Sequence, residues 1–502
     1  MKLRSRTIYS TGNANHLLRW AVLPAEIRLM ILEQAEIGDI QAHDLSNWPR
    51  VSREWQTFFE PQIFQHLKLQ IPGSDIDDLN SCVHGYRRDL VKRISLHVRT
   101  QEYDNVDRFD EEESPDTIKA NNKLFSQALK RLFVSLSAWS SGSPRSGIKL
   151  SLSAGSPSGS SHPWEHRAGT ERSQHDRRRV YSLNSRRRLL GNLIDASSGA
   201  LKLPQVSVVN RFSVNQYCYR SLSRTLLAKV LHSLCRLKPV NYEPWYAIAY
   251  FEQGFRNVAT AMLLGCVSES STMNSVHIWE AKSRLNESAH FFRLRDEYLI
   301  YQAVNSSYRL QCLTICHAVD ARDFFRHASR DLPPNYSQPL DGLRTWPALK
   351  YLALTTHIGD LVSRPSALEN LLLQASRAAL RMHLLEVMEI WASDSDNGFI
   401  FRYHVREGSP FLTVIATWQL TLSEKALGSW KQVAAGCSEH ELTCNVELTR
   451  SDLPNFPCNL LKLGPQLRDW FRVCSNRFTK VLLCYEFGST TCTHIDFLVY
   501  FE

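Results

Sequence analysis

The sequence predicts an α/β protein with an N-terminal helical segment, an irregular α/β solenoid and a smaller α+β C-terminal segment. Three observations lead to this prediction. A helical pattern occupies residues 21–69, one apolar motif recurs along most of the chain, and strand alternation begins at residue 399. The chain has 502 residues, of which 43% are hydrophobic and 22% charged, so it has enough apolar material for a large core.

Residues 1–20 have few periodic apolar positions, and we expect a flexible leader there. In the segment 21–69, Pro24 suits the first turn of a helix, and Ile27 and Ile31 lie on one helical stripe. A second helix is expected after Pro49, and Pro61 is expected to end it. These short helices carry more apolar surface than a bundle of this size can hide, which predicts a binding partner.

The next two regions contain loops. We assign 70–134 to the first repeat units, interrupted by an acidic loop, because 102–116 holds eight acidic side chains against one arginine. We assign 135–200 to a loop region that is rich first in serine and then in arginine.

One motif, apolar-x-x-apolar-x-apolar, then recurs through residues 201–398. Its last two apolar positions are two residues apart, so both point to one face of a short strand. Helix-like runs separate the copies, and a strand, a helix and a parallel strand form a crossover unit. Stacked units of this kind bury a continuous core. The clearest copies start 36, 37, 39 and 36 residues apart: Leu237/Val240/Tyr242, Met273/Val276/Ile278, Leu310/Leu313/Ile315, Leu349/Leu352/Leu354 and Leu385/Met388/Ile390. Earlier copies are Phe64/Leu67/Leu69, Val91/Ile94/Leu96 and Leu203/Val206/Val208.

The last region, 399–502, is the predicted α+β segment. Residues 399–406 alternate with strand period, Gly408 marks a turn, and a second strand-like run continues to about 420. Ser423 is positioned to cap a helix that ends near 435.

The N-terminal helical segment resembles an F-box through Leu23-Pro24-Ala25-Glu26-Ile27, Ile31-Leu32, Val51-Ser52-Arg53-Glu54-Trp55 and Phe64–Leu69. It is similar to the F-box of fungal F-box domain-containing proteins. The resemblance implies that this segment binds the Skp-type adaptor of an SCF-type cullin–RING ubiquitin ligase, and through it a cullin. It also implies a receptor subunit that is not an enzyme. The positions that match the adaptor-facing or supporting residues are Leu23, Pro24, Ile27, Ile31, Leu32, Val51 and Trp55.

The recurring motif resembles the L-x-x-L-x-L core of leucine-rich repeats, although these units exceed the usual 20–29 residues. The resemblance implies that the strand face collects side chains from successive units and binds a protein substrate. Two tryptophans on that face are typical of binding hot spots, unless the segment after 399 covers them. The candidate substrate-binding residues are Glu243, His277, Trp279, Glu389 and Trp391.

An arginine cluster supports a rival function, a nuclear scaffold or nucleic-acid-binding protein. Residues 162–190 contain two Arg-Arg-Arg triplets, which suit a nuclear-import signal or a phosphate-binding patch. A solvated basic loop is the simpler interpretation. Tyr181 is the only aromatic residue among the arginines, so we do not expect nucleic acid as the main partner.

We predict no catalytic residue, metal or cofactor. The chain lacks the motifs GxxxxGK[ST], GxGxxG and HExxH. Cys437, His440, Cys444 and Cys458 have loosely metal-like spacing but lack a tight ligand pair. There is no long apolar run and no signal-peptide pattern, so we expect no membrane partner and a place in the cytoplasm, the nucleus or both.

Overall fold

The structure, a computed structural model, describes two compact units of the chain. One consists of Met1–Leu67 with Val83–Lys92, and the other of Lys68–Cys82 with Arg93–Glu502. The described residues are 20–37, 47–102, 113–139, 147–157, 193–196, 201–215, 218, 220–244, 250–280, 295–329, 344–393, 397–438 and 440–448. The predicted leader up to residue 19, most of the acidic loop, the arginine cluster and the chain after 448 lie outside them.

The first unit is helical, as its pattern predicts. Ser52 caps the N-terminus of helix α3 by accepting a hydrogen bond from the backbone N–H of Trp55. The prediction that Pro61 ends this helix is wrong, because Pro61 lies inside it. The helix continues although Pro61 cannot donate to the carbonyl of Thr57. Its elements are η1 (Trp20–Val22), α1 (Ala25–Ile37), η2 (Trp48–Arg50), α3 (Arg53–Gln65) and α5 (Arg87–Leu90).

A buried carboxylate holds the last turns of α3 against α5. Glu60 is 2% exposed and accepts hydrogen bonds from Arg87 Nη2 at 2.6 Å, from the Tyr86 hydroxyl and from Gln56 Nε2. These three donors lower the pKa of Glu60 despite its burial, and the Arg87 guanidinium also lies over the Phe64 ring. The contacts compensate for the donor that Pro61 lacks.

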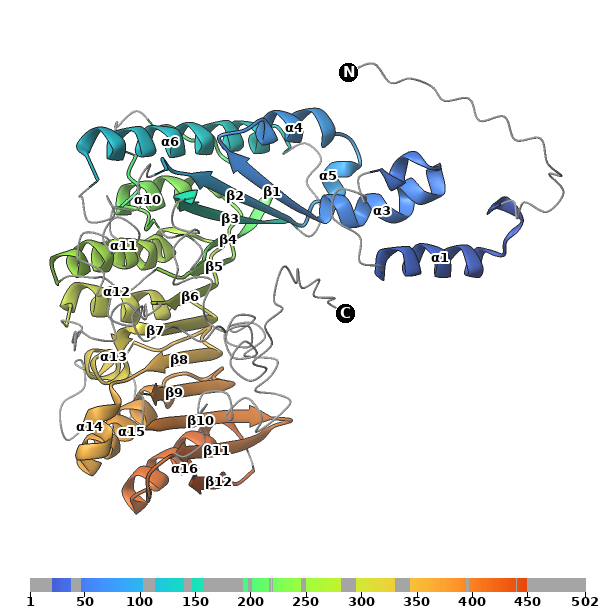
Figure 1. The fold of residues 1–502 in the computed structure, drawn as a ribbon. Coiled ribbons are helices and arrows are strands. Elements are labelled where there is room, and N and C mark those ends of the chain that lie inside the picture. The colour runs from blue at the N-terminus through green and yellow to red at the C-terminus, as the bar shows by residue number, and fades with distance from the viewer. Residues whose placement is uncertain are drawn as a thin grey trace, which may run out of the picture. The chain divides into compact units, whose positions relative to one another are not determined.

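The second unit is built on one sheet of twelve strands whose spatial order follows the sequence (Figure 1). Neighbouring strands are parallel from β2 to β9, β10 is antiparallel to β9 and β11, and β12 is parallel to β11. The strands are β1 (His66–Ile71), β2 (Arg93–Arg99), β3 (Ile148–Gly155), β4 (Val209–Val214), β5 (Pro239–Tyr242), β6 (Ser275–Trp279), β7 (Cys312–Asp320), β8 (Tyr351–Thr355), β9 (Val387–Ser393), β10 (Gly398–Arg406), β11 (Ser409–Ala416) and β12 (Thr443–Leu448).

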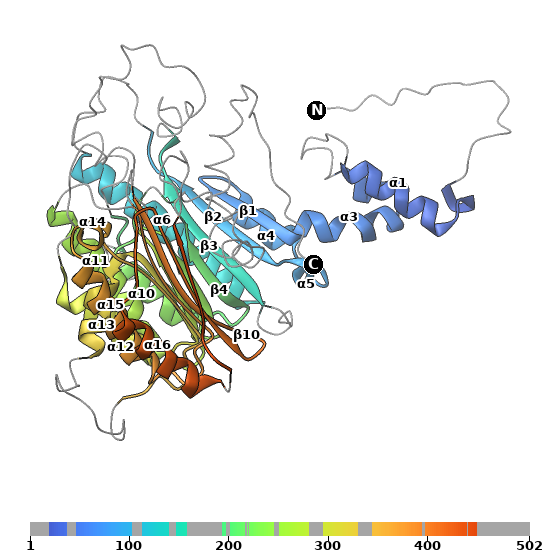
Figure 2. The same cartoon turned by 90° about the horizontal axis from the view of Figure 1, so that it is seen from below.

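Helices alternate with the strands and line one face of the sheet (Figures 1 and 2). Several begin at a side-chain cap that the sequence supplies, such as Ser114, Ser223 and Asp296. The face opposite the helices is called the open face below. The helices are α4 (Asp75–Cys82), α6 (Pro115–Ser137), α10 (Arg224–Ser233), α11 (Tyr250–Glu269), α12 (Glu297–Ser307), α13 (Ala321–Ala328), α14 (Ile358–Ser363), α15 (Pro365–Ala379) and α16 (Glu424–Cys437).

The recurring motif forms the core between the sheet and the helices. Every apolar position of the five clearest copies is buried, and those of the strands β6 to β8 are at most 1% exposed. The prediction of parallel strands alternating with helices is therefore confirmed, and the arrangement is consistent with LRR-like repeats. One early copy is misplaced, because β4 begins only at Val209, after Leu203/Val206/Val208. In the other two early copies the last two apolar positions lie in strands as predicted: Leu67 and Leu69 in β1, and Ile94 and Leu96 in β2.

The described part of the predicted C-terminal segment extends the same sheet. Residues 398–406 form β10, Gly408 takes a φ of +80° in the turn, and Ser423 caps α16 as expected. The α+β composition is therefore present. Residues Gly398 to His404 of β10 pair with β9, however, so this segment continues the sheet of the repeats.

Candidate functional site

In the first unit, α1 presents apolar side chains to solvent. Ile27 is 42% exposed, Ile31 is 39% exposed and Met30, a neighbour on the same predicted stripe, is 57% exposed. Their spacing of three and four residues places them on one side of the helix. Among the other predicted adaptor residues, Pro24 and Val51 are exposed, Leu23 and Trp55 are half-buried, and Leu32 is buried.

The less exposed members of this set stabilise the unit. Trp55 packs against Trp20, Trp48 and Phe59, with ring centroids 5.6–6.0 Å apart. Glu54 accepts hydrogen bonds from Trp20 Nε1 at 2.7 Å and from Arg28 Nη1 at 2.8 Å, which ties α1 to α3. Leu32 and Trp55 therefore support the exposed stripe of α1.

Four of the five predicted substrate residues lie on the open face of the sheet, because His277, Trp279, Glu389 and Trp391 alternate with core positions along β6 and β9. The structure brings only some of them together. Trp279 on β6 and Trp391 on β9 are half-buried, and their rings stack with centroids 5.5 Å apart. Three strand spacings separate their backbones by about 14 Å, so the rings must meet above β7 and β8. The open-face residues below them, Cys316 and Thr355, are small and at most 3% exposed.

His317 completes this aromatic cluster, which we define as Trp279, His317 and Trp391. Its ring stands at 90° to Trp279 and at 85° to Trp391, with centroids 5.5 and 5.3 Å away. The sequence analysis did not predict His317. One signal was available, because the interval between the copies at Leu310 and Leu349, 39 residues, is the longest.

A strained bulge places His317 in the cluster. The register of β7 against β8 jumps from Ile315 to Asp320, so four residues of β7 have no partner in β8. Within this bulge His317 has a φ of +62°, which is uncommon for a residue with a Cβ. Its backbone N–H donates to Thr355 Oγ1 at 2.6 Å. The fold thus holds the histidine in a conformation that its own backbone disfavours.

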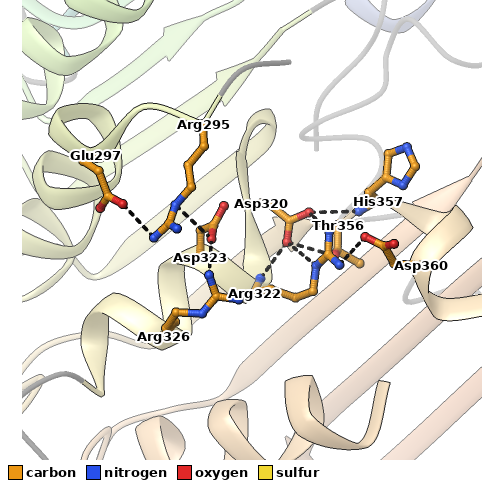
Figure 3. Close-up of polar contacts among 9 residues, drawn as sticks. All are labelled: Arg295, Glu297, Asp320, Arg322, Asp323, Arg326, Thr356, His357 and Asp360. Atoms are coloured by element: carbon orange, nitrogen blue, oxygen red, sulfur yellow. Dashed lines mark hydrogen bonds and ion pairs between the residues drawn. The ribbon is translucent and has the colours of Figure 1, made fainter. Parts of the chain in front are cut away.

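The end of the bulge is fixed by Asp320 (Figure 3). Its carboxylate caps α13 by accepting from Arg322 N at 2.8 Å, and it also accepts from Thr356 Oγ1 at 3.0 Å and from His357 N at 3.1 Å. Arg322 bridges onward to Asp360 at 2.5 Å, which lowers the pKa of that carboxyl group. The turns after β7 and β8 are therefore linked at one end of the cluster.

Two further predicted residues are held by neighbouring strands. His277 contacts Thr314 Oγ1 at 3.1 Å and Ser275 Oγ at 2.9 Å, and burial lowers its pKa to about 4. Glu389 is 4% exposed and pairs with Arg402 Nε at 3.2 Å. Burial nevertheless raises the pKa of Glu389 to about 7. The fifth residue, Glu243, directly follows β5, whose last residue Tyr242 pairs with Ile278 of β6.

The strands β2 to β4 carry a different surface. Arg93, Lys149 and Arg211 are direct cross-strand partners on the open face, and we call them the basic row. Arg93 and Arg211 are exposed and Lys149 is half-buried. The adjacent row contains serines, of which Ser151 and Ser213 are hydrogen-bonded at 2.7 Å.

The remaining sequence candidates do not form a centre in the described part of the chain. Cys437, His440 and Cys444 are exposed, and Cys458 lies outside the described residues. Where the chain is described, no three His, Cys, Asp or Glu side chains gather as metal ligands would. Within the same residues, no helix is both long and apolar enough to span a bilayer.

Residues 268–459 are similar to a family described as a family of unknown function (DUF6546). The match includes the whole aromatic cluster and the sheet from β6 to β12. No curated protein matches the chain.

Proposed function

We propose that the chain is the substrate receptor of an SCF-type cullin–RING ubiquitin ligase. The observation that carries the proposal is the exposed apolar stripe of α1, formed by Ile27, Met30 and Ile31, on a compact helical unit that resembles an F-box. Such a stripe stabilises a complex when a partner helix removes it from water. Its proposed partner is a Skp-type adaptor, which in turn binds a cullin.

The repeats suit the other half of this function. A sheet with one face covered by helices leaves its open face available to display side chains from many strands. A receptor of this kind accelerates ubiquitin transfer by holding the substrate close to the conjugating enzyme, so the chain itself needs no catalytic residue. The proposal therefore assigns binding, and no chemical step, to the open face.

The test is adaptor binding by the full chain with both Ile27→Ala and Ile31→Ala. We expect binding to a purified Skp-type adaptor to weaken by at least about 30-fold, because both side chains would be interface anchors. The control carries Glu33→Ala and Gln34→Ala, which are exposed polar positions of the same helix. Unchanged adaptor binding by a folded Ile27/Ile31 variant would reject the proposal.

A second candidate function, binding of a nucleic acid or another polyanion, is favoured by the basic row. The arginine cluster behind this alternative lies outside the described residues, but Arg93, Lys149 and Arg211 present like charges side by side. A gel shift that weakens steeply with salt, and weakens further when Arg93 and Arg211 are changed to Gln, would favour this candidate.

A further inference from the structure

The helix side of the sheet is covered as far as β11. Trp430 on α16 packs against Phe401 and Tyr403 of β10, with ring centroids 4.8 and 5.2 Å apart. The β11 partners of these two residues, Val414 and Leu412, are at most 1% exposed. The core that runs through the repeats therefore continues to β11.

Strand β12 continues the same apolar row, but its side chains are exposed. Val446 pairs with Val414 of β11 and so lies on the helix side of the sheet. Its neighbours two residues away, Cys444 and Leu448, share that side. Val446 is nevertheless 43% exposed and Leu448 is 64% exposed, and the Cys444 thiol is exposed too. We call these three residues the uncovered row.

The sequence of β12 is that of a strand buried on one side. Apolar residues alternate strictly with polar ones along Thr443-Cys444-Asn445-Val446-Glu447-Leu448. Such alternation is typical of a strand with one face on a core. Strand β12 is also the last strand of the sheet, so its outer edge has no partner among the described residues. An apolar row beside an open edge is a surface that folded chains usually cover.

The sequence after β12 contains one segment that fits this surface. The chain continues for 54 residues after Leu448. Pro465 suits the first turn of a helix, and charged residues occupy one side of the pattern that follows it. On the other side, apolar residues recur at helical spacing: Leu467, Trp470, Phe471 and Cys474.

The repeat spacing leads to the same segment. One more copy of the recurring motif is Phe478/Val481/Leu483. Its last two positions come 37 residues after Cys444 and Val446, and the clearest copies are 36 to 39 residues apart. The linker lengths agree as well, because 16 residues separate β12 from the helical pattern and 17 separate β6 from α12.

We propose that residues 465–485 add one further repeat unit beyond β12. Residues 465–475 form a helix on the uncovered row, and residues 480–485 form a strand parallel to the outer edge of β12. A strand, a helix and a parallel strand connect in the right-handed sense, which places the new helix on the side of α16. The occupant of the uncovered row is thus a segment of the same chain.

The experiment measures how fast iodoacetamide alkylates the Cys444 thiol in the folded full chain, by mass spectrometry. The full chain is compared with a variant carrying Leu467→Gln and Trp470→Gln, which removes two apolar contacts of the proposed helix. The matched control carries Arg468→Gln and Arg472→Gln on the charged side. We expect slow alkylation in the full chain and the control, and alkylation roughly tenfold faster or more in the Leu467/Trp470 variant, because a thiol reacts only where the reagent reaches it.

A second measurement uses natural cysteines and needs no variant. A crossover helix runs antiparallel to the strands that it connects, so the last turn of the proposed helix lies over the first residues of β12. Cys474 is then close to Cys444, and a short bismaleimide should join the two within one chain. Cys82 on α4 is the control, since it is exposed at the other end of the sheet and should not be joined to Cys474.

Three results would overturn the inference. Alkylation of Cys444 in the full chain as fast as in the urea-unfolded chain would show that the row stays in water. Slow alkylation that becomes faster on dilution, with twice the chain mass in light scattering, would assign the cover to a second copy. Alkylation equally slow in the full chain and the Leu467/Trp470 variant, at every dilution, would assign it to another segment of this chain.

Discussion

Two groups of strands, β1 to β4 and β5 to β9 (the two halves below), share one core but differ in the charges that their residues carry. The strands β1 to β4 contain five lysines and arginines and no acidic residue, whereas β5 to β9 contain two acidic residues and no lysine or arginine. On the helix side the same apolar positions recur and are buried in both halves. Fold and surface chemistry are thus encoded at alternating positions of the same strands.

This difference shows which positions of a repeat can specialise. Core positions must fit the neighbouring units, so they change little from β2 to β9. Open-face positions contact mainly their cross-strand neighbours, and they vary from Ser151 beside Ser213 to Glu389 beside Arg402. Binding properties of the chain should therefore follow the open face, and stability should follow the core.

The largest expected effect tests whether the core is equivalent in the two halves. Ile94→Ala on β2 and Ile278→Ala on β6 should each lower the free energy of unfolding by about 2–5 kcal/mol, because both side chains are fully buried. Denaturant unfolding of the full chain measures both variants, with Asn241→Ala on the open face as the control. A loss confined to one half would show that the sheet does not share one cooperative core.

The second prediction concerns the pH dependence of stability, which an acidic residue of β9 should cause. The pKa of Glu389 is raised from its ordinary value of 4.5 to about 7, and Arg402 is the charged group that faces it from β10, while Ala353 faces it from β8. The folded state therefore holds the proton more tightly than the unfolded state. Stability from this group is fully present below about pH 4.5 and is lost as the pH rises to about 7, by roughly 3 kcal/mol. In Glu389→Gln this slope of unfolding free energy against pH should disappear; an unchanged slope would contradict the assignment.

His277 should act in the opposite direction. Its pKa falls from 6.5 to about 4, so its contribution is present above pH 6.5 and is lost as the pH falls toward 4. His277→Asn should flatten the acid side of the stability profile and leave the slope caused by Glu389 unchanged. A variant that also removed that slope would show that the two groups titrate together.

Much of the fold could be predicted because its signal is periodic. The motif from Leu237 to Ile390 places five strands correctly, since burial on one face dictates spacing. The boundary at Pro61 failed, because the contacts of Glu60 with α5 outweigh the intrinsic preference of proline. The early copy Leu203/Val206/Val208 failed because Val206 and Val208 are buried before β4 begins at Val209.

The candidate site could be predicted only in part. Strand alternation was sufficient to place Trp279 and Trp391 on one face, but it gives no information about rings that reach across two strands. His317 lies in a bulge, where the period of two no longer indicates which way a side chain points. Asp320 similarly depends on Thr356 and His357 from the next unit. Such tertiary pairings leave no local pattern.

The fourth prediction concerns the support of the cluster. Asp320→Ala removes the cap of α13 and the contacts to Thr356 and His357, which should cost about 1–2 kcal/mol of unfolding free energy. It should also change the tryptophan signal in near-ultraviolet circular dichroism, because the bulge loses its anchor. Asp323→Ala is the control, since Asp323 contacts Arg326 and Arg295 at the surface (Figure 3) and should cost less than about 1 kcal/mol. If the two variants lost the same free energy of unfolding, Asp320 would not be the residue that supports the cluster.

The smallest expected effect concerns the basic row. Like charges directly opposite one another in neighbouring strands are destabilising, by roughly 0.2–1 kcal/mol per pair. Arg211→Gln should therefore raise the free energy of unfolding by a few tenths of a kcal/mol at low salt, because Lys149 is its cross-strand partner. The gain should shrink as salt screens the repulsion, whereas the buried pair of Glu389 and Arg402 should respond little. Arg406→Gln at the end of β10, where the partner is Ser409, is the control and should show no gain. If Arg211→Gln were destabilising at low salt, the basic row would be stabilised by an anionic group. The positive charges of β2 to β4 would then be neutralised, and the two halves would no longer differ in the sign of their surface charge.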